Sequence, residues 1–567
     1  MSLLIKNGFV YDPINGVNGE VMDIAVEGGR IIEKVNEYGA QVIDASGMIV
    51  MPGGIDIHTH IAGSEVNAGR LLRPEDHIYD FEPKTPITRS GVGHSIPSTF
   101  TTGYRYTRMG YTFLCNPSMP PLEARHTHEE LEDTPIVDKV TFPLLGDWWF
   151  VLEYLRDGLV KECAEHAAWM IMATKGYAIK IVNPGGLEAW GFGRNVKDLD
   201  DQVPYFNITP KEIIRGLCIV NKILNLPHTI HVHTNRLGQP GNYLTTIKTM
   251  ECVEDLATSD KPVIHITHCQ FSAFKGDSWA NMRSGAEDIA KYVNRHSHVT
   301  LDMGQIVFTD TTTMTADGPW QYTLYEISGN KWVNHDVEVE TSSGIVPFKY
   351  RRKSYVHAIM WSIGLELALL IEDPWKIYLT TDHPNGGPFT SYPRIISWLM
   401  SEKARERVLK RINRKAKAKS LLPSINREMT FYEIAIITRA GQAKALGLKS
   451  KGHLGIGADA DISIYNIDPR KIDPSRDYKA VRRAFSNAAY TIKSGEIVAV
   501  NGRIVKAPAG RTYWINFEAY CGADCLLRAA AELKRKFRDY WTIEFDNYFI
   551  PERYLKISAP ISIKAGV

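Results

Sequence analysis

The chain has 567 residues, more than a single hydrophobic core usually contains, so we expect one large domain and at least one satellite. Hydrophobic residues make up 44% and charged residues 23%, as in an ordinary globular protein. The 66 lysine and arginine residues nearly balance the 64 acidic residues, which argues against a general affinity for nucleic acid or for an anionic membrane.

The N-terminus and the cysteines predict a soluble cytoplasmic protein without electron-transfer groups of its own. The start, MSLLIKNGFVYDP, lacks the basic region and long apolar core of a signal peptide, and no uncharged apolar run is long enough to span a bilayer. Seven cysteines are scattered singly, which predicts reduced thiols and no site for an iron–sulfur cluster or a pterin metal. One basic run, residues 403–419 (KARERVLKRINRKAKAK), departs from the even charge and predicts a solvated helix face.

Strand signals occupy both ends of the chain. Residues 1–50 predict short strands separated by Asn-Gly and Gly-Gly turns, in LLIKNGFVYD, DIAVEGGRIIEKV and QVIDASGMIVMPG. Residues 431–510 predict the last helix of the central domain and then a second strand-rich block, DADISIYNI and AAYTIKSGEIVAVNGRIV. We therefore expect a β-sandwich satellite formed by the N- and C-terminal segments, and over residues 511–567 a packing arm with an amphipathic helix and aromatic side chains.

The middle of the chain, residues 51–430, alternates strands with helices. The eight candidate strands are MIVMPGGIDIH, YTFLC, TFPLL, YAIKIV, HTIHVHT, PVIHITH, HVTLDM and KIYLTTD. This alternation predicts an α/β fold with a parallel sheet, and eight strands in succession favour a closed (β/α)8 TIM-like barrel. A doubly wound open sheet remains the alternative, because strand count alone does not exclude it. Two irregular segments, about 62–130 and 305–352, predict long insertions that serve as lids, binding loops or partner contacts.

The first chemical signal is the pair His58 and His60, at the end of the first predicted barrel strand. Residues two apart on a strand share a face, so the two imidazoles would lie side by side where a barrel collects its catalytic groups. A lone His-x-His is common and usually without function. Here it follows an apolar strand and a Gly-Gly turn, which makes half of a metal site the better interpretation.

Lys180 lies in a strand between Ile179 and Ile181 and would face the barrel interior. Burial of a charged lysine is costly, so this position needs a physical reason. Reaction of the neutral amine with CO2 supplies one, because the resulting carbamate is an anion whose two oxygens can bridge two cations. The alternative is an inward lysine paired with a carboxylate.

Histidines also end the next two strands. HTIHVHTN offers His228, His231 and His233, and HITHCQ offers His265 and His268. Only groups near the C-terminal end of a strand can reach the site, which favours His233 and His268, with His231 and His265 as fallback ligands or as neighbours of the ligands. Each histidine taken singly is more often a satisfied core residue, and two consecutive strands that end this way weaken that interpretation.

Asp382 ends the last candidate strand, in LTTDHP. An aspartate at this end of a barrel can touch a metal through one oxygen and take a proton from a bridging water through the other. An N-cap for the following segment is an equally good explanation of Asp382 alone.

The order His-x-His, Lys, His, His, Asp across strands one, four, five, six and eight resembles the amidohydrolase superfamily, in the type where a carboxylated lysine bridges two zinc ions. The tail KALGLKSKGHLGIGADADISIYNIDP is similar to the return of that family to its β-sandwich. More narrowly, GGIDIHTHIAGSEVNAGR, GYAIKIVNPGG, HVHTNRLGQPGNY, HITHCQFSAF and TTDHPNGGPFTSYPRIISWLM resemble the catalytic A subunits of archaeal formylmethanofuran dehydrogenases.

The resemblance implies an enzyme that interconverts formate plus methanofuran with N-formylmethanofuran, in the first step of methanogenesis from CO2. It implies partner subunits that carry tungsten or molybdenum and iron–sulfur clusters and reduce CO2 to formate. It also implies that Asp382 carries the proton in catalysis. The implied ligands of two Zn2+ ions are His58, His60, N6-carboxylated Lys180, His233, His268 and Asp382.

Two other functions fit the same sequence. One is a stand-alone cyclic amidase or D-aminoacylase-like hydrolase, and the other is a non-catalytic barrel scaffold, against which the six filled ligand positions argue. Within the first insertion, a group of aromatic and basic residues could bind an aromatic and acidic substrate tail by stacking and ion pairing, although a subunit interface explains it at least as well. This group is Tyr104, Arg105, Tyr106 and Arg108.

Overall fold

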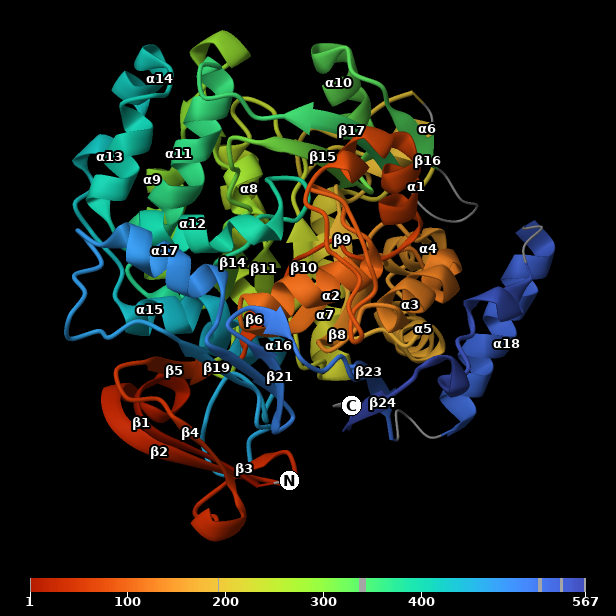
Figure 1. Cartoon of the computed structure of the whole chain (residues 1–567). Helices are drawn as coiled ribbons and strands as arrows, with labels where there is room; N and C mark the ends of the chain where they lie inside the picture. Colours follow the sequence, from red (N-terminus) through yellow and green to blue (C-terminus); the bar gives the residue numbers. More distant parts are fainter. Residues whose placement is uncertain (1, 192, 336–342, 519–522, 541–543, 565–567) are drawn as a thin grey trace.

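The computed structural model describes residues 2–191, 193–335, 343–518, 523–540 and 544–564. Its centre is a set of parallel strands surrounded by helices (Figure 1). A separate sheet, made from both ends of the chain, lies at one side of this central domain (Figure 1).

Eight parallel strands of the central domain follow one another in ring order. Two five-stranded sheets supply them, ordered β18-β14-β11-β10-β9 and β24-β23-β8-β7-β6. Parallel bridges from Leu144 to Lys180 and from Thr59 to His383 join β8 to β9 and β6 to β18, so the circuit returns to its first strand. Each predicted strand segment overlaps one of the eight. They are β6 (Gly54–Asp56), β7 (Tyr111–Met119), β8 (Asp138–Pro143), β9 (Lys180–Val182), β10 (Ile230–His233), β11 (Ile264–Ile266), β14 (Val299–Asp302) and β18 (Ile377–Tyr378).

Helices lie between successive strands, and local sequence sets their ends. Thr209 and Glu212 form a capping box at the start of α7 (Pro210–Leu224). Two helices precede β9, α4 (Trp149–Arg156) and α5 (Val160–Ala173), and Gly158 takes a positive φ of 72° between them. The other helices of the central domain are α1 (Ser64–Leu72), α2 (Thr99–Arg108), α3 (Ala124–Glu132), α6 (Gly186–Gly191), α8 (Tyr243–Glu251), α9 (Ala286–Arg295), α10 (Gly318–Ser328), α11 (Tyr355–Leu370), α12 (Tyr392–Leu399), α13 (Glu402–Leu409), α14 (Arg414–Lys419), α15 (Phe431–Ala435) and α16 (Gly441–Leu446). No helix in the described residues is long and apolar enough to cross a membrane.

The terminal sheet joins the two ends of the chain in one continuous nine-stranded sheet. Its two halves meet where β5 pairs antiparallel with β19, with Pro52 opposite Ile462. The predicted strand MIVMPGGIDIH is divided at Gly53, because β5 belongs to this sheet and β6 to the ring. A side chain at Gly53 would collide with Thr112, so the crossing point requires glycine. The strands are β1 (Ser2–Asp12), β2 (Val17–Glu27), β3 (Arg30–Ile32), β4 (Gln41–Asp44), β5 (Ile49–Pro52), β19 (Ile462–Tyr465), β20 (Tyr490–Lys493), β21 (Glu496–Val500) and β22 (Arg503–Ile504).

A buried ion cluster fastens the terminal sheet to the ring. The Lys451 ammonium lies 2.7 Å from Asp138 at the start of β8, 2.7 Å from Asp461 and 2.9 Å from Asp459. Lys493 on β20 reaches Asp138 at 2.8 Å and Asp461 at 3.0 Å. Burial raises the pKa of Asp461, but the two ammonium groups outweigh burial and hold that pKa below its ordinary value. The three carboxylates are close enough to bind a metal, but the two lysines already supply their counter-charges.

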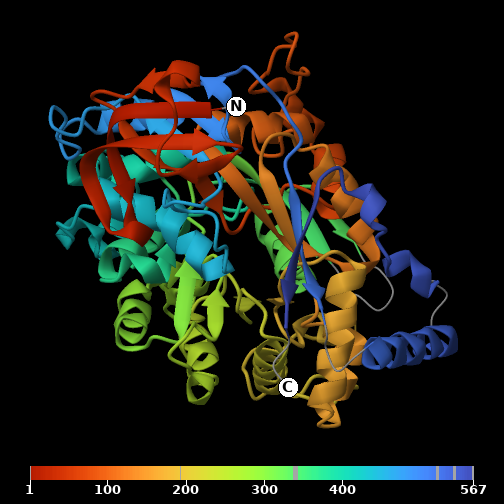
Figure 2. The same ribbon diagram turned by 90° about the horizontal axis from the view of Figure 1, so that it is seen from below.

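The C-terminal arm contains strands as well as the predicted helix. β23 (Thr512–Phe517) pairs with β8 through Thr512 and Lys139, and β24 (Ser558–Ile563) lies parallel to β23. The helix α18 (Ala523–Tyr540) projects at the edge of the molecule and packs against α5 (Figure 2). The arm therefore extends the strand layer of the central domain.

Candidate metal centre

A cavity of about 330 Å³ opens at the C-terminal ends of the ring strands. All six side chains predicted as metal ligands line this cavity. They come from the segments that follow or include strands far apart in sequence, and the ring order of those strands brings them together. The six are His58, His60, Lys180, His233, His268 and Asp382.

His58, His60 and Asp382 face one another at the floor of the cavity. Oδ1 of Asp382 lies 3.0 Å from Nε2 of His58 and 3.2 Å from Nε2 of His60. Nε2 of His58 and Oδ1 of Asp382 are buried and have no hydrogen-bond partner in the described structure, although they are close together. Buried polar atoms rarely lack a hydrogen-bond partner, so these two atoms fit the coordination of a ligand such as a metal ion.

Lys180 begins β9 and its ammonium group is buried at the same floor. Its one hydrogen bond in the described structure is long, 3.4 Å to Oγ1 of Thr267. Burial lowers the pKa of Lys180 to about 8, and the carboxylates of Asp382 and Asp302 oppose that shift. A substantial fraction of this amine is therefore neutral near pH 8, which is the form that reacts with CO2.

The hydrogen bonds of Thr267 fix the tautomer of His268. Oγ1 of Thr267 donates its only hydrogen to the carbonyl of Val232 at 3.1 Å, so it must accept from Nε2 of His268 at 2.9 Å. The other ring nitrogen, Nδ1, then carries a lone pair, and it is buried without a partner. Burial also lowers the pKa of His268 well below its ordinary value, which keeps this lone pair unprotonated.

Asp317 fixes the second histidine in a similar way. Its Oδ2 accepts from Nε2 of His233 at 3.1 Å, while its Oδ1 caps α10 at the backbone N–H of Trp320. Nδ1 of His233 is thereby left with its lone pair. A carboxylate behind a ligand histidine is the usual arrangement in metal sites, because it orients the ring and raises its basicity.

A chain of three histidines fixes the third ring. The carbonyl of Ala445 can only accept, so Nδ1 of His228 donates to it at 2.7 Å. Burial lowers the pKa of His228 to about 3, so its Nε2 is unprotonated and accepts from Nδ1 of His231 at 3.0 Å. His231, also neutral because of burial, then accepts through Nε2 from Nδ1 of His58 at 2.9 Å. The lone pair of His58 is consequently on Nε2, the atom that faces Asp382.

The two fallback histidines lie away from the cavity. His231 uses both ring nitrogens in the histidine chain, and His265 uses both in contacts with Oγ1 of Thr300 at 2.9 Å and Oδ2 of Asp302 at 3.1 Å. Neither residue lines the cavity, so the structure places them as neighbours of the site.

The polar end of the cavity thus brings together three imidazole lone pairs, one carboxylate oxygen without a partner and one lysine with a lowered pKa. This donor set fits a pair of divalent cations, since neutral imidazole nitrogens and carboxylate oxygens are common zinc ligands. No sequence pattern singled out Asp317, His228 or Asp302 as partners of these groups. Of these three residues, Asp317 has a recognisable local pattern, because Asp-Gly-Pro is typical of the start of a helix. That pattern indicates an N-cap residue and says nothing about a metal site.

The histidine chain predicts that His228 controls metal affinity although it lies outside the cavity. His228→Ala removes the acceptor that orients His231, so His58 loses the fixed partner for its Nδ1–H. We expect zinc affinity, measured by competition with a chromophoric chelator, to fall about 10- to 100-fold. The matched control is His128→Ala, another buried histidine that contacts a backbone carbonyl, that of Thr174. Equal affinities in the two variants would remove the proposed effect of the chain.

The upper part of the cavity is apolar. Aromatic rings stand along it, with Trp279 and Trp320 stacked at a centroid distance of 6.4 Å. Such walls exclude water from the polar groups of the cavity and suit an apolar or aromatic part of a ligand. The apolar lining is Val182, Leu237, Phe271, Phe274, Trp279, Ala316, Trp320, Leu324, Ile327, Phe348, Val356 and Met360.

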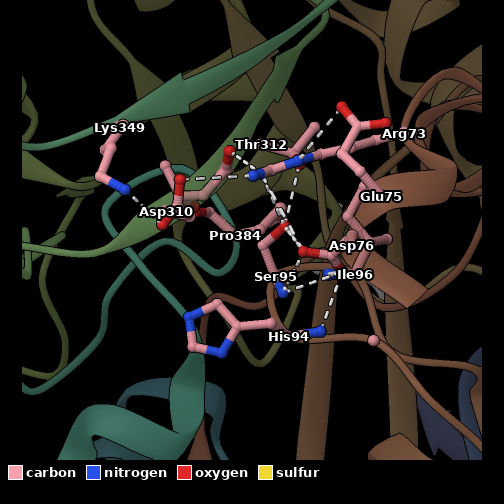
Figure 3. A network of polar contacts seen from close by, with 12 residues as sticks. Arg73, Glu75, Asp76, His94, Ser95, Ile96, Asp310, Thr312, Lys349 and Pro384 are labelled. Atoms are coloured by element: carbon pink, nitrogen blue, oxygen red, sulfur yellow. Dashed lines mark hydrogen bonds and ion pairs between the residues drawn. The ribbon is translucent and has the colours of Figure 1, made fainter. Parts of the chain in front are cut away.

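A network around Arg73 holds the two insertions together beside this cavity (Figure 3). The guanidinium donates to the carbonyl of Thr311 and to the hydroxyl of Ser95 at 3.2 Å, and so bridges the first insertion to β15 (Asp310–Thr315) of the second. Asp76 accepts from the backbone of Ser95 at 3.0 Å, and Thr311 donates to the carbonyl of Pro384. The segment that follows Asp382 is therefore tied to both insertions.

The aromatic and basic group of the first insertion does not line the cavity. Arg105 and Arg108 both pair with Glu82 of the same insertion, at 3.3 and 2.8 Å. Tyr106 donates to Asp56 at 2.6 Å and stacks on Phe389. Tyr104 is buried between apolar side chains, so all four residues are engaged in contacts within the protein.

Comparison with known proteins gives full-length similarity. The amidohydrolase family matches residues 41–499. The chain is 51% identical to protein FwdA of Methanocaldococcus jannaschii, over 100% of this chain and 99% of that one. It is 36% identical to the A component of the formyltransferase/hydrolase complex Fhc of Methylorubrum extorquens, over 94% of each. The crystal structure of that FhcABCD complex with methylofuran matches with a TM-score of 0.90 and 33% identity, over 99% of this chain and 100% of that one.

Proposed function

Because the chain belongs to the amidohydrolase family and is homologous along its length to FwdA and to the A component of Fhc, we propose that it cleaves and forms an N-formyl amide bond. The substrate pair is formate plus methanofuran on one side and N-formylmethanofuran on the other. In this proposal the strand ring is a (β/α)8 barrel of the amidohydrolase type, and the terminal sheet is its β-sandwich satellite.

The observation that carries this proposal is the convergence of six donor side chains on one buried floor. We assign two Zn2+ ions to His58, His60, N6-carboxylated Lys180, His233, His268 and Asp382. When bound, such ions would lower the pKa of a water from about 15.7 towards 7 and polarise the formyl oxygen. The carbamate forms when the neutral Lys180 amine bonds to CO2 and releases a proton, and burial of this amine supports that step.

Asp382 is the proton carrier in this proposal. Burial raises the pKa of its carboxyl, which His60 opposes, so the group accepts a proton more readily than an exposed aspartate. In the hydrolytic direction it takes a proton from the attacking water and gives it to the amine as the carbon–nitrogen bond breaks. In the reverse direction two protons of the entering ammonium group pass through it to one formate oxygen, which then leaves as water. The apolar walls keep other water away, which strengthens the electrostatic interactions inside the site.

We propose that the chain works within a multisubunit complex, and the assembly named for the Fhc relative supports this. The partners would be subunits that contain tungsten or molybdenum and iron–sulfur clusters and supply formate. Delivery inside the complex would raise the local formate concentration, which helps a condensation that is unfavourable in open water.

The test is an assay of the full-length zinc-loaded chain on three substrate classes. N-formylmethanofuran should release formate at a rate proportional to zinc content, whereas hydantoins and N-acyl-D-amino acids should react at least about 100-fold more slowly. Faster reaction of either comparison class would point to a stand-alone amidase. A protein that binds no zinc and releases no formate would be a scaffold.

A further inference from the structure

A second cavity, of about 270 Å³, lies on another side of the central domain and is strongly basic. It is formed where α12, α13 and α17 (Tyr478–Ser486) pack together, to the left in Figure 1, with the segment that follows β17 (Ser343–Lys349). Six of its twelve lining residues are cations, and none is acidic. The six are Arg352, Arg394, Arg407, Arg411, Lys479 and Arg482.

The basic charge of this cavity comes from four separate stretches of chain. Arg407 and Arg411 belong to the basic run 403–419, which the sequence alone presents as a solvated helix face. Both side chains are exposed, as that prediction requires, and they line the cavity together with arginines that lie far away in sequence. Since the whole chain carries a formal charge of only +2, this concentration of positive charge is a local feature.

The cations lack counter-charges in the part of the chain that the structure describes. No described carboxylate forms an ion pair with any of the six, and the recorded contacts are neutral. Arg407 donates to the Tyr478 hydroxyl at 2.7 Å, and the guanidinium of Arg352 lies 5.8 Å from the ring centre of Phe308. By contrast, the half-buried Arg215 has an acidic partner, Asp255, at 2.6 Å.

Arg394 marks the inner part of the cavity. Its side chain is half-buried, and burial together with the guanidinium groups of Arg482 and Arg352 lowers its pKa to about 10. Like charges held together in a partly buried place repel one another at a cost that folding must offset. A bound anion would remove that repulsion.

We propose that this cavity binds a small ligand that carries at least two phosphate or carboxylate groups. Guanidinium groups form paired hydrogen bonds with such groups, and several guanidinium groups around one hollow favour multivalent over monovalent anions. The volume lies just below the range of about 300 to 1,000 Å³ that is typical of small-molecule sites. Trp398 and Tyr478 supply flat walls beside the charged groups. The inference is independent of the chemistry proposed for the first cavity.

Isothermal titration of the full-length chain tests this site with pyrophosphate and with citrate as probes, and with acetate as the monovalent reference. At 0.1 M salt we expect one pyrophosphate or citrate per chain with a Kd below about 1 mM, and binding of acetate at least tenfold weaker. The better of the two probes identifies whether phosphate or carboxylate is the preferred group. Affinity should fall steeply between 0.1 and 0.5 M salt.

The variants are Arg482→Gln and the pair Arg394→Gln with Arg482→Gln, and each should weaken binding at least tenfold. Arg483→Gln is the matched control, because it removes the same charge from the next position of α17 but does not line the cavity. Arg482 is exposed, so its replacement leaves the fold intact even if the replacement of Arg394 does not. Absence of binding to the wild type, or equal losses in Arg482→Gln and Arg483→Gln, would overturn the proposal. Binding that disappears when the chain is assembled with partner subunits would also overturn it and identify an interface.

Discussion

Lys180→Ala is expected to lose at least one of the two zinc ions and to lower the rate of formyl release about 1,000-fold or more. The carbamate is the one proposed ligand that would bridge both ions, and a metal supplies several kcal/mol of transition-state stabilisation. Zinc per chain, measured by mass spectrometry beside the rate, checks both parts. Lys175→Ala is the matched control, because Lys175 is also buried but contacts the Trp514 ring outside the site.

The same prediction has a pH dependence. Only the neutral amine adds CO2, and burial lowers the pKa of Lys180 to about 8. At a fixed concentration of dissolved CO2, zinc reconstitution of the metal-free chain should therefore accelerate as pH rises from 7 to 9 and then level off. A chain that takes up two zinc ions equally well without CO2, or a Lys180→Ala variant that keeps both ions, would rule out the bridging role.

Asp382→Asn is expected to keep zinc and lose catalysis. The amide has nearly the same shape and retains an oxygen towards His58 and His60, but it cannot accept a proton at neutral pH. General acid–base catalysis typically contributes about 100- to 10,000-fold, so kcat should fall by that amount with little change in KM.

Asp310→Asn provides the comparison for this variant. Asp310 is a half-buried carboxylate of the second insertion, where it pairs with Lys349 at 2.9 Å, and its replacement should leave kcat near the wild-type value. If Asp382→Asn also turned over normally with full zinc, another group would have to move the proton. If it lost its zinc, Asp382 would be needed first as a ligand.

Much of this site could be predicted from short sequence patterns, because the reactive side chains lie in or directly after the strands that the same patterns reveal. His58 and His60 are two residues apart at a strand end, and Lys180 stands between two buried isoleucines, so local spacing was enough to place them. The ring order of the strands then carries them to one end. The same reasoning recognised the eight strand segments from their apolar runs.

The remaining features depend on partners that are distant in sequence. The tautomer of His58 is set by the carbonyl of Ala445, 387 positions further along the chain, and no local pattern marks that contact. Tyr104, Arg105, Tyr106 and Arg108 suggested a ligand-binding surface, because aromatic and basic residues can stack on an aromatic ligand and pair with an acidic one. Glu82 and Asp56, which engage three of them, become neighbours only when the insertion folds.

The pairing of β5 with β19 has a consequence for synthesis. Ile462 pairs with Pro52, so the partner of β5 leaves the ribosome about 400 residues later, which corresponds to roughly 20 to 80 s at 5–20 residues per second. Throughout that interval β5 presents an open edge that is apolar and prone to join other chains. The terminal sheet therefore cannot be completed during synthesis before residue 462 has emerged. A nascent chain stalled before that residue would be a substrate for chaperones.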